Sequence, residues 1–238
     1  MNKFKNINGL AFYKTYLKNE FSEIRDYLND TKDLIKSKQE KLSEHISCEL
    51  KKVSHPDDEQ EIIEFHIDDI IKYQDTYIEL LMNSTFITTF SLFESSFHRI
   101  CEYLQNDNQL TLSDFKGIGG IDKYRKYIEK IVELDLTSLN QKWVTIKNYG
   151  KVRNLIIHNS ANFKKDKSKK LEEQEMYSFI TFNPSIQLKT FRKGNFYIND
   201  HKFINDFCDI GESYLEEVIT KAIEQKRYCH KPNQTNVQ

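Results

Sequence analysis

The chain has 238 residues, of which 38% are hydrophobic and 30% are charged, and its formal net charge is -1. A chain of this length can bury a sizeable core, and its near-neutral charge excludes a surface that is basic all over. With only 7 glycines and 3 prolines it is also poor in turn formers, so we expect a mainly all-α fold rather than a turn-rich β architecture.

Two segments of the chain carry opposite charge. Residues 20–80 contain 17 acidic and 8 basic side chains, a net charge of -9, whereas residues 121–170 contain 13 basic and 5 acidic side chains, a net charge of +8. The basic segment would attract a polyanion such as RNA. Alternatively, the two segments attract each other within a chain or between chains.

The sequence offers no metal or cofactor motif. Its histidines are scattered without an HExxH pattern, and the pairs His66–Asp69 and Glu94–His98 would bind a cation only by chance. The cysteines form no CxxC pair, so a zinc ribbon or disulfide framework is not expected. They are Cys48, Cys101, Cys208 and Cys229. No apolar run approaches the ~20 residues of a membrane span, and we expect a soluble, cytoplasmic protein.

The first predicted element is an amphipathic helix from about residue 12 to 52. The alternative is a break at residues 29–31, where an N-cap could restart the helix. Pro56 disfavours helical backbone at His55, so residues 54–58 are expected to form a turn, with Asp57 or Asp58 capping the next helix. Residues 1–72 together are expected to form an N-terminal helical extension that serves dimerisation, sensing or binding of an inhibitor.

A long helix is predicted from the turn to about residue 104. Its second half has apolar residues at alternating steps of four and three, which is typical of a core-facing stripe. These are Phe86, Phe90, Phe93, Phe97, Ile100 and Leu104. Ser91, Glu94, His98 and Cys101 form an adjacent row. From spacing alone, Glu94 is a candidate surface partner of His98 at i,i+4.

Residues 106–120 are predicted to be a loop. The glycines at 117, 119 and 120 do not continue into GKS or GKT, so the loop is interpreted as a connection and not as a phosphate site. A short basic helix is predicted from about 122 to 134, with four exposed cations: Lys123, Arg125, Lys126 and Lys130.

The next helix begins near Ser138 and contains the string Arg153-Asn154-Leu155-Ile156-Ile157-His158. Gly150 is expected to interrupt it. An arginine is suited to binding phosphate, and a histidine can accept or donate a proton near neutral pH. This string is the strongest candidate for a site. The alternative is that Arg153 pairs within a buried helix and His158 merely ends it.

RNLIIH, preceded by residues 143–149 and followed by Asn159-Ser160-Ala161, resembles the signature of HEPN domains, in which Arg and His are separated by four to six residues. The first intervening residue is Asn, a form that the family favours. The resemblance extends over about residues 73–227 and implies a HEPN-like helical bundle. Some members are controlled by an antitoxin that modifies a Tyr two residues after the His, a position that Ser160 occupies here.

The resemblance implies a metal-independent endoribonuclease, a toxin or anti-phage defence effector that cleaves single-stranded RNA and leaves DNA intact. It assigns proton transfer to His158, phosphate binding to Arg153 and an orienting role to Asn154, with Glu94 as an acidic neighbour. It also implies a homodimer and an antitoxin or sensor protein as partner. The alternatives are a non-catalytic HEPN-like dimer that binds nucleotide, RNA or a partner protein, and a purely structural helical protein.

Helical geometry limits how these side chains can cooperate. Lys147, Lys151, Asn154 and His158 are spaced to share one face of a helix, but Arg153 and His158 are about 140° apart around a straight one. Convergence would require a bend at Gly150, a long side-chain path or a second chain. Five lysines between 164 and 170 follow in a predicted polar loop, and Lys164, Lys165 and Lys167 are candidate RNA ligands together with Lys147 and Lys151.

The chain is expected to end with a small β-hairpin, a helix and a tail. Residues 186–189 and 196–198 alternate or are rich in β formers, and a turn at 193–195 separates them. A last helix is predicted from about 201 to 226, with an apolar face that includes Phe203, Phe207 and Tyr214. Residues 228–238 are expected to be a disordered tail.

Overall fold

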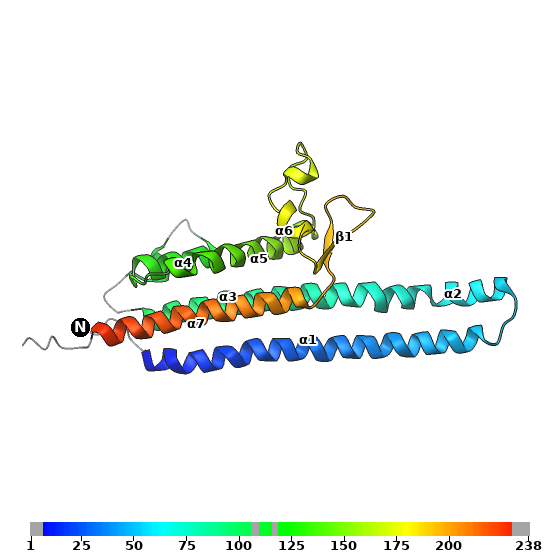
Figure 1. Ribbon diagram of the computed structural model, residues 1–238, viewed down its shortest axis with the longest axis horizontal. Coiled ribbons are helices and arrows are strands. Elements are labelled where there is room, and N and C mark those ends of the chain that lie inside the picture. Colours follow the sequence, from blue (N-terminus) through cyan, green and yellow to red (C-terminus); the bar gives the residue numbers. More distant parts are fainter. Residues whose placement is uncertain (1–6, 106–109, 116–118, 230–238) are drawn as a thin grey trace, which may run out of the picture. The chain divides into compact units, whose positions relative to one another are not determined.

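A computed structural model describes residues 7–105, 110–115 and 119–229 (Figure 1). The described residues are largely helical and contain one small two-stranded sheet, which confirms the predicted mainly all-α fold with a hairpin before the last helix. No helix among these residues is both long and apolar enough to cross a membrane. The predicted tail at 230–238 and the glycine at 117 lie outside the described residues, and residues 228 and 229 still belong to the last helix.

The chain divides into two compact units whose segments interleave along the sequence. The first consists of the described parts of residues 1–22, 89–150 and 206–238, and the second consists of residues 23–88 and 151–205. The boundaries that the sequence suggests, at residues 72 and 227, stay a prediction.

Helix α1 (Ile7–Leu50) is a single helix of 44 residues, which confirms the predicted long helix, and the alternative of a break at residues 29–31 is not observed (Figure 1). Leu28 and Ile35, two helical turns apart, are both buried, and neither Gly nor Pro lies between them. One apolar face therefore continues past the polar residues at 29–31.

The predicted break before α2 (Pro56–Ile71) is present, but residues 56–58, which were expected in the turn, already belong to the helix, and its cap is His55 and not an aspartate. The imidazole Nδ1 of His55 accepts a hydrogen bond from the Asp57 amide at 3.4 Å. Pro56 is favoured at this first position, because its fixed φ suits a helix and it has no amide hydrogen to satisfy. A π-helical turn, η1 (Lys72–Thr76), joins α2 to α3 (Tyr77–Leu104), so the long predicted helical run is present with one local irregularity.

The core of the first unit is aromatic. On α3, Phe90 stacks on Phe207 of α7 (Lys202–Cys229) with ring centroids 5.3 Å apart. Phe97 contacts Tyr214 of α7 and Trp143 of α5 (Asn140–Asn159), at centroid distances of 5.6 and 6.0 Å. This confirms the α3 stripe as core, where such edge and offset contacts add to the area buried.

The short basic helix is α4 (Gly120–Lys130), and its Arg125 is buried rather than exposed as expected. Its Nε donates to Glu129 at 2.8 Å, one Nη donates to the Asn140 side chain, and the guanidinium lies over the Trp143 ring. A charge can be buried when it is paired and hydrogen-bonded in this way.

The second unit contains the predicted hairpin. Strands β1 (Ile186–Leu188) and β2 (Phe196–Ile198) are antiparallel, with Ile186 opposite Ile198. A short helix, α6 (Tyr177–Thr181), precedes them. The described residues also contain three 3-10 turns. Two are in the first unit, η2 (Leu112–Asp114) and η3 (Thr137–Leu139), and one is in the second, η4 (Leu171–Glu173).

Candidate functional site

Helix α5 carries the RNLIIH string in its last turns and is not interrupted at Gly150, contrary to expectation. A Cβ added at Gly150 would lie 3.0 Å from the Cζ of Phe90, so the glycine leaves room for a packed ring. A single glycine costs a helix only about 1 kcal/mol, which tertiary packing can offset. The residue type is therefore explained by close packing and not by a break.

Because α5 is continuous to Asn159, Arg153 and His158 remain about 140° apart around its axis. The Nη1 of Arg153 donates to the Oδ1 of its neighbour Asn154 at 3.1 Å. Its Nε is buried without a hydrogen-bond partner among the described residues. Asn154 and His158 are both exposed, four residues apart on the same face.

The chain reverses immediately after His158. Ser160 and Ala161 have φ values of 51° and 53°, a left-handed conformation that costs residues with a Cβ roughly 1–2 kcal/mol each. The Ala161 amide donates to the Leu155 carbonyl at 3.0 Å and closes the end of α5. Within the described part of the chain, the exposed imidazole of His158 has no hydrogen-bond or ion-pair partner.

The turn of the β-hairpin holds this reversal in place. Asn195 donates from its side chain to the Ser160 carbonyl at 3.0 Å, and the Phe196 amide donates to the Ala161 carbonyl at 2.9 Å. The Phe163 amide donates to the carbonyl of Gly194 at 3.0 Å. We call these contacts between residues 160–164 and 193–196 the hairpin clamp.

The sequence identified Gly194 and Asn195 of the hairpin clamp only as parts of a turn, and it gave Asn162 no role. Gly194 has a φ of +84°, and a Cβ there would lie 2.9 Å from the Cβ of Lys164. Asn162 donates to the Asn195 side chain at 2.7 Å and accepts from the Lys164 amide at 2.8 Å. A glycine next to an asparagine is a general turn signal, but it does not identify the segment that the turn contacts.

The predicted RNA-binding lysines differ in their availability. Lys165 and Lys167 are exposed in the second unit, Lys164 is half-buried there, and Lys147 is exposed on the part of α5 that belongs to the first unit. Lys151 forms a 2.6 Å ion pair with Glu175, which holds the pKa of that carboxyl below its ordinary value. The positive charge of Lys151 is therefore already paired with a carboxylate.

The lysine segment is not the free loop that its composition suggests. The buried side chain of Gln174 donates to the Asp166 carbonyl at 2.7 Å and accepts from the Asp166 amide at 3.2 Å. A cavity of about 200 Å³ lies beside it. Its lining mixes cations, carboxylates and apolar groups and includes Lys151, Lys165, Lys169, Glu173, Glu175 and Phe163.

Glu94 lies half-buried on α3 in the first unit, with its Oε1 3.8 Å from the Cβ position of Gly120. The ion pair on this part of α3 joins His98 to Glu102 at 3.7 Å, so the alternative partnership of Glu94 with His98 is not observed. Arg153 and His158 belong to the second unit. The role of Glu94 as their acidic neighbour stays a prediction.

A second polar cluster lies where α1 and α2 approach each other. The Nε2 of His66 on α2 is 2.8 Å from the Oε2 of Glu49 on α1, and the Nε2 of His45 is 3.5 Å from the Oε1 of the same carboxylate. His66 is buried, and its ring lies 5.4 Å from that of His45. Sequence reasoning missed this cluster, whose only local signal was His45 and Glu49 at i,i+4.

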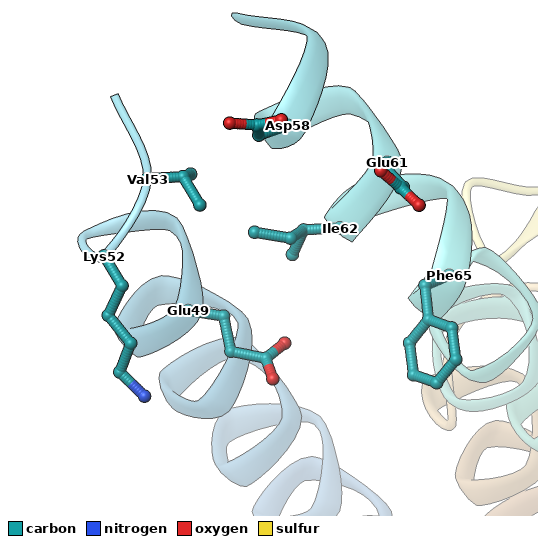
Figure 2. A pocket seen from close by; sticks show the side chains of 7 residues that line it. All are labelled: Glu49, Lys52, Val53, Asp58, Glu61, Ile62 and Phe65. Atoms are coloured by element: carbon teal, nitrogen blue, oxygen red, sulfur yellow. The ribbon is translucent and has the colours of Figure 1, made fainter. Parts of the chain in front are cut away.

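Figure 2 shows the neighbouring pocket, into which Glu49 extends from α1 while Ile62 points from α2. The pocket has a volume of about 510 Å³ and is otherwise lined by Lys52, Val53, Asp58, Glu61 and Phe65.

No protein-family model matches the chain, and neither a curated protein nor a solved structure matches it significantly.

Proposed function

We propose that the chain is a metal-independent endoribonuclease of HEPN type that cleaves single-stranded RNA, with His158, Arg153 and Asn154 at its site. The observation that carries the proposal is the exposed His158 on the same helical face as Asn154, whose side chain accepts a hydrogen bond from Arg153. The polar side chains of the string, Arg153, Asn154 and His158, thus lie in the last turns of α5.

In the proposed reaction, His158 removes the proton of an RNA 2′-hydroxyl, and the oxygen attacks the adjacent phosphorus while the bond from phosphorus to the 5′-oxygen breaks. The protonated His158 then returns the proton to the departing 5′-oxygen. The products are a 2′,3′-cyclic phosphate and a 5′-hydroxyl. An imidazole can accept this proton near neutral pH. Arg153 binds the phosphate and stabilises its additional negative charge. Asn154 orients either His158 or the phosphate. The exposed Lys165 and Lys167 contact flanking phosphates. DNA lacks the attacking hydroxyl and is not cleaved.

The proposed enzyme acts as a homodimer, because Arg153 and His158 of one chain are on different sides of an uninterrupted α5. A twofold axis beside α5 would place Arg153 of one chain near His158 of the other, and every such contact would occur twice. We infer a toxin or defence effector in the cytoplasm, restrained by an antitoxin or sensor protein. Cleavage of cellular RNA would make unrestrained activity harmful to the cell.

A second candidate function is a non-catalytic HEPN-like dimer that binds RNA, nucleotide or a partner protein. The separation of Arg153 from His158 and the buried Nε of Arg153 favour it, since both are expected of an arginine that supports the fold. The two candidates differ in whether the phosphodiester bond is broken.

The test is incubation of the full chain with a labelled single-stranded RNA, and with DNA of the same sequence, in excess EDTA. We expect cleavage of RNA only, with cyclic phosphate ends. His158→Ala should reduce the rate about 10²- to 10⁴-fold, the usual contribution of a general acid or base. His98→Ala, at a half-buried histidine on α3, is the control. Equal cleavage by wild type and His158→Ala would refute the catalytic assignment, and binding without cleavage would favour the second candidate.

A further inference from the structure

We propose that His45, Glu49 and His66 form a site for a divalent transition-metal ion, with zinc as the best match. Two imidazole nitrogens and a carboxylate are a ligand set that zinc commonly uses. The site is independent of the proposed catalytic residues, which are on α5.

The distances between the ligand atoms suit a small ion. All three side chains have a ligand atom within 4.8 Å of the others. The Nε2 of His66 is 2.8 Å from one oxygen of Glu49 and the Nε2 of His45 is 3.5 Å from the other, both near the roughly 3.3 Å between neighbouring ligands of a tetrahedral ion with bonds of about 2.0–2.1 Å. The side chain of His45 is exposed and therefore has room to adjust to an ion.

The cluster is already partly organised. His66 is buried and hydrogen-bonded to Glu49, so two of the three ligands are fixed by packing between α1 and α2. Since a carboxylate can only accept, the Nε2 of His66 carries the proton in this bond. A metal ion would replace that proton, which is the usual exchange when an imidazole becomes a ligand.

The surroundings favour a cation. Residues 20–80, which contain all three ligands, have 17 acidic and 8 basic side chains. Asp58 and Glu61 line the pocket beside Glu49, and Lys52 is the one cation in that lining (Figure 2). Three protein ligands leave a fourth position for water or for a group from another molecule. The bound ion would link α1 to α2 near the turn that connects them.

The experiment is a titration of the full chain with zinc chloride by isothermal calorimetry, with cobalt(II) absorption as a spectroscopic signature of tetrahedral coordination. We expect one ion per chain and visible cobalt bands that zinc removes. His45→Ala, whose side chain is mostly exposed in the fold, should bind at least about tenfold more weakly, because a ligand is lost. Glu49→Gln should also weaken binding, whereas circular dichroism should show both variants folded.

Two controls define the ligand set. His98→Ala removes a half-buried histidine that also has a carboxylate partner at i,i+4, but no third ligand is near it in the described structure, so zinc affinity should not change. Cys48→Ser removes the exposed thiol three residues after His45 and should leave affinity unchanged too. The proposal is overturned if wild type binds no zinc, if His45→Ala binds as tightly as wild type, or if Cys48→Ser abolishes binding.

Discussion

The two histidine sites of the second unit differ in how their side chains are held. His158 is exposed at the end of α5, and its position depends on the hairpin clamp that fixes the following backbone. His66 is buried between two helices and is fixed by its own hydrogen bond to Glu49. The first arrangement leaves the imidazole free for a substrate, and the second brings together groups that can bind an ion. Similar residue types are therefore suited to different chemistry by their tertiary setting.

The strongest test of the α5 site is to mix two inactive variants. If Arg153 of one chain serves His158 of its partner, a heterodimer of Arg153→Ala and His158→Ala chains contains one intact site. RNA cleavage should then reappear on mixing, although each variant alone is nearly inactive. The measurement is the cleavage rate after subunit exchange. No recovery in a mixture shown to contain heterodimers would place both residues in one chain or remove the catalytic role.

The hairpin clamp should be sensitive to a single methyl group. Gly194→Ala introduces a Cβ at a φ of +84° and 2.9 Å from Lys164, so we expect a loss of about 1–2 kcal/mol in the free energy of unfolding. Urea denaturation measures it. Lys193→Ala, in the same turn with an exposed side chain, should change stability by less than about 0.5 kcal/mol. Equal effects of the two substitutions would mean that the clamp does not restrain this turn.

RNA affinity should separate free from paired lysines near the α5 site. In a His158→Ala background, Lys165→Ala and Lys167→Ala should weaken binding, and each lost phosphate contact should reduce the salt slope by roughly 0.7. Lys151→Ala should have a smaller effect because Glu175 already neutralises it. Fluorescence anisotropy at several salt concentrations measures all three. The distinction between free and paired lysines is wrong if Lys151→Ala weakens RNA binding more than the other two substitutions do.

The smallest expected effect is the pH dependence of the α1–α2 cluster. The hydrogen bond from His66 holds the pKa of Glu49 below its ordinary value of 4.5. A carboxyl with a lowered folded-state pKa stabilises the fold above its unfolded-state pKa, and this contribution is lost as the pH falls through the folded-state value. In metal-free buffer, Glu49→Gln should therefore lose stability relative to wild type near neutral pH, and the difference should shrink in acid.

Urea midpoints between about pH 6 and pH 3 measure this difference. Glu44→Gln, at an exposed glutamate on the same helix, is the control. A difference between Glu49→Gln and wild type that stays constant over this range would show that the ionised carboxylate is not the stabilising form.

Local patterns in the sequence predicted much of the fold. The apolar stripe on α3, the break before Pro56 and the two strands of the hairpin are all present. The predictions failed where local signals were weaker than packing. Gly150 did not interrupt α5, and Arg125 became buried beside Trp143.

The sequence by itself determined the helical class, the order of the long helices and the hairpin, and the string at the end of α5, because these depend on periodicity and on neighbours in the chain. Only the tertiary structure brought His66 to Glu49 across the α1–α2 turn, joined Gly194 and Asn195 to the residues after His158, and paired Lys151 with Glu175. These contacts join residues 17 or more positions apart, and no local propensity encodes which distant partners pack together.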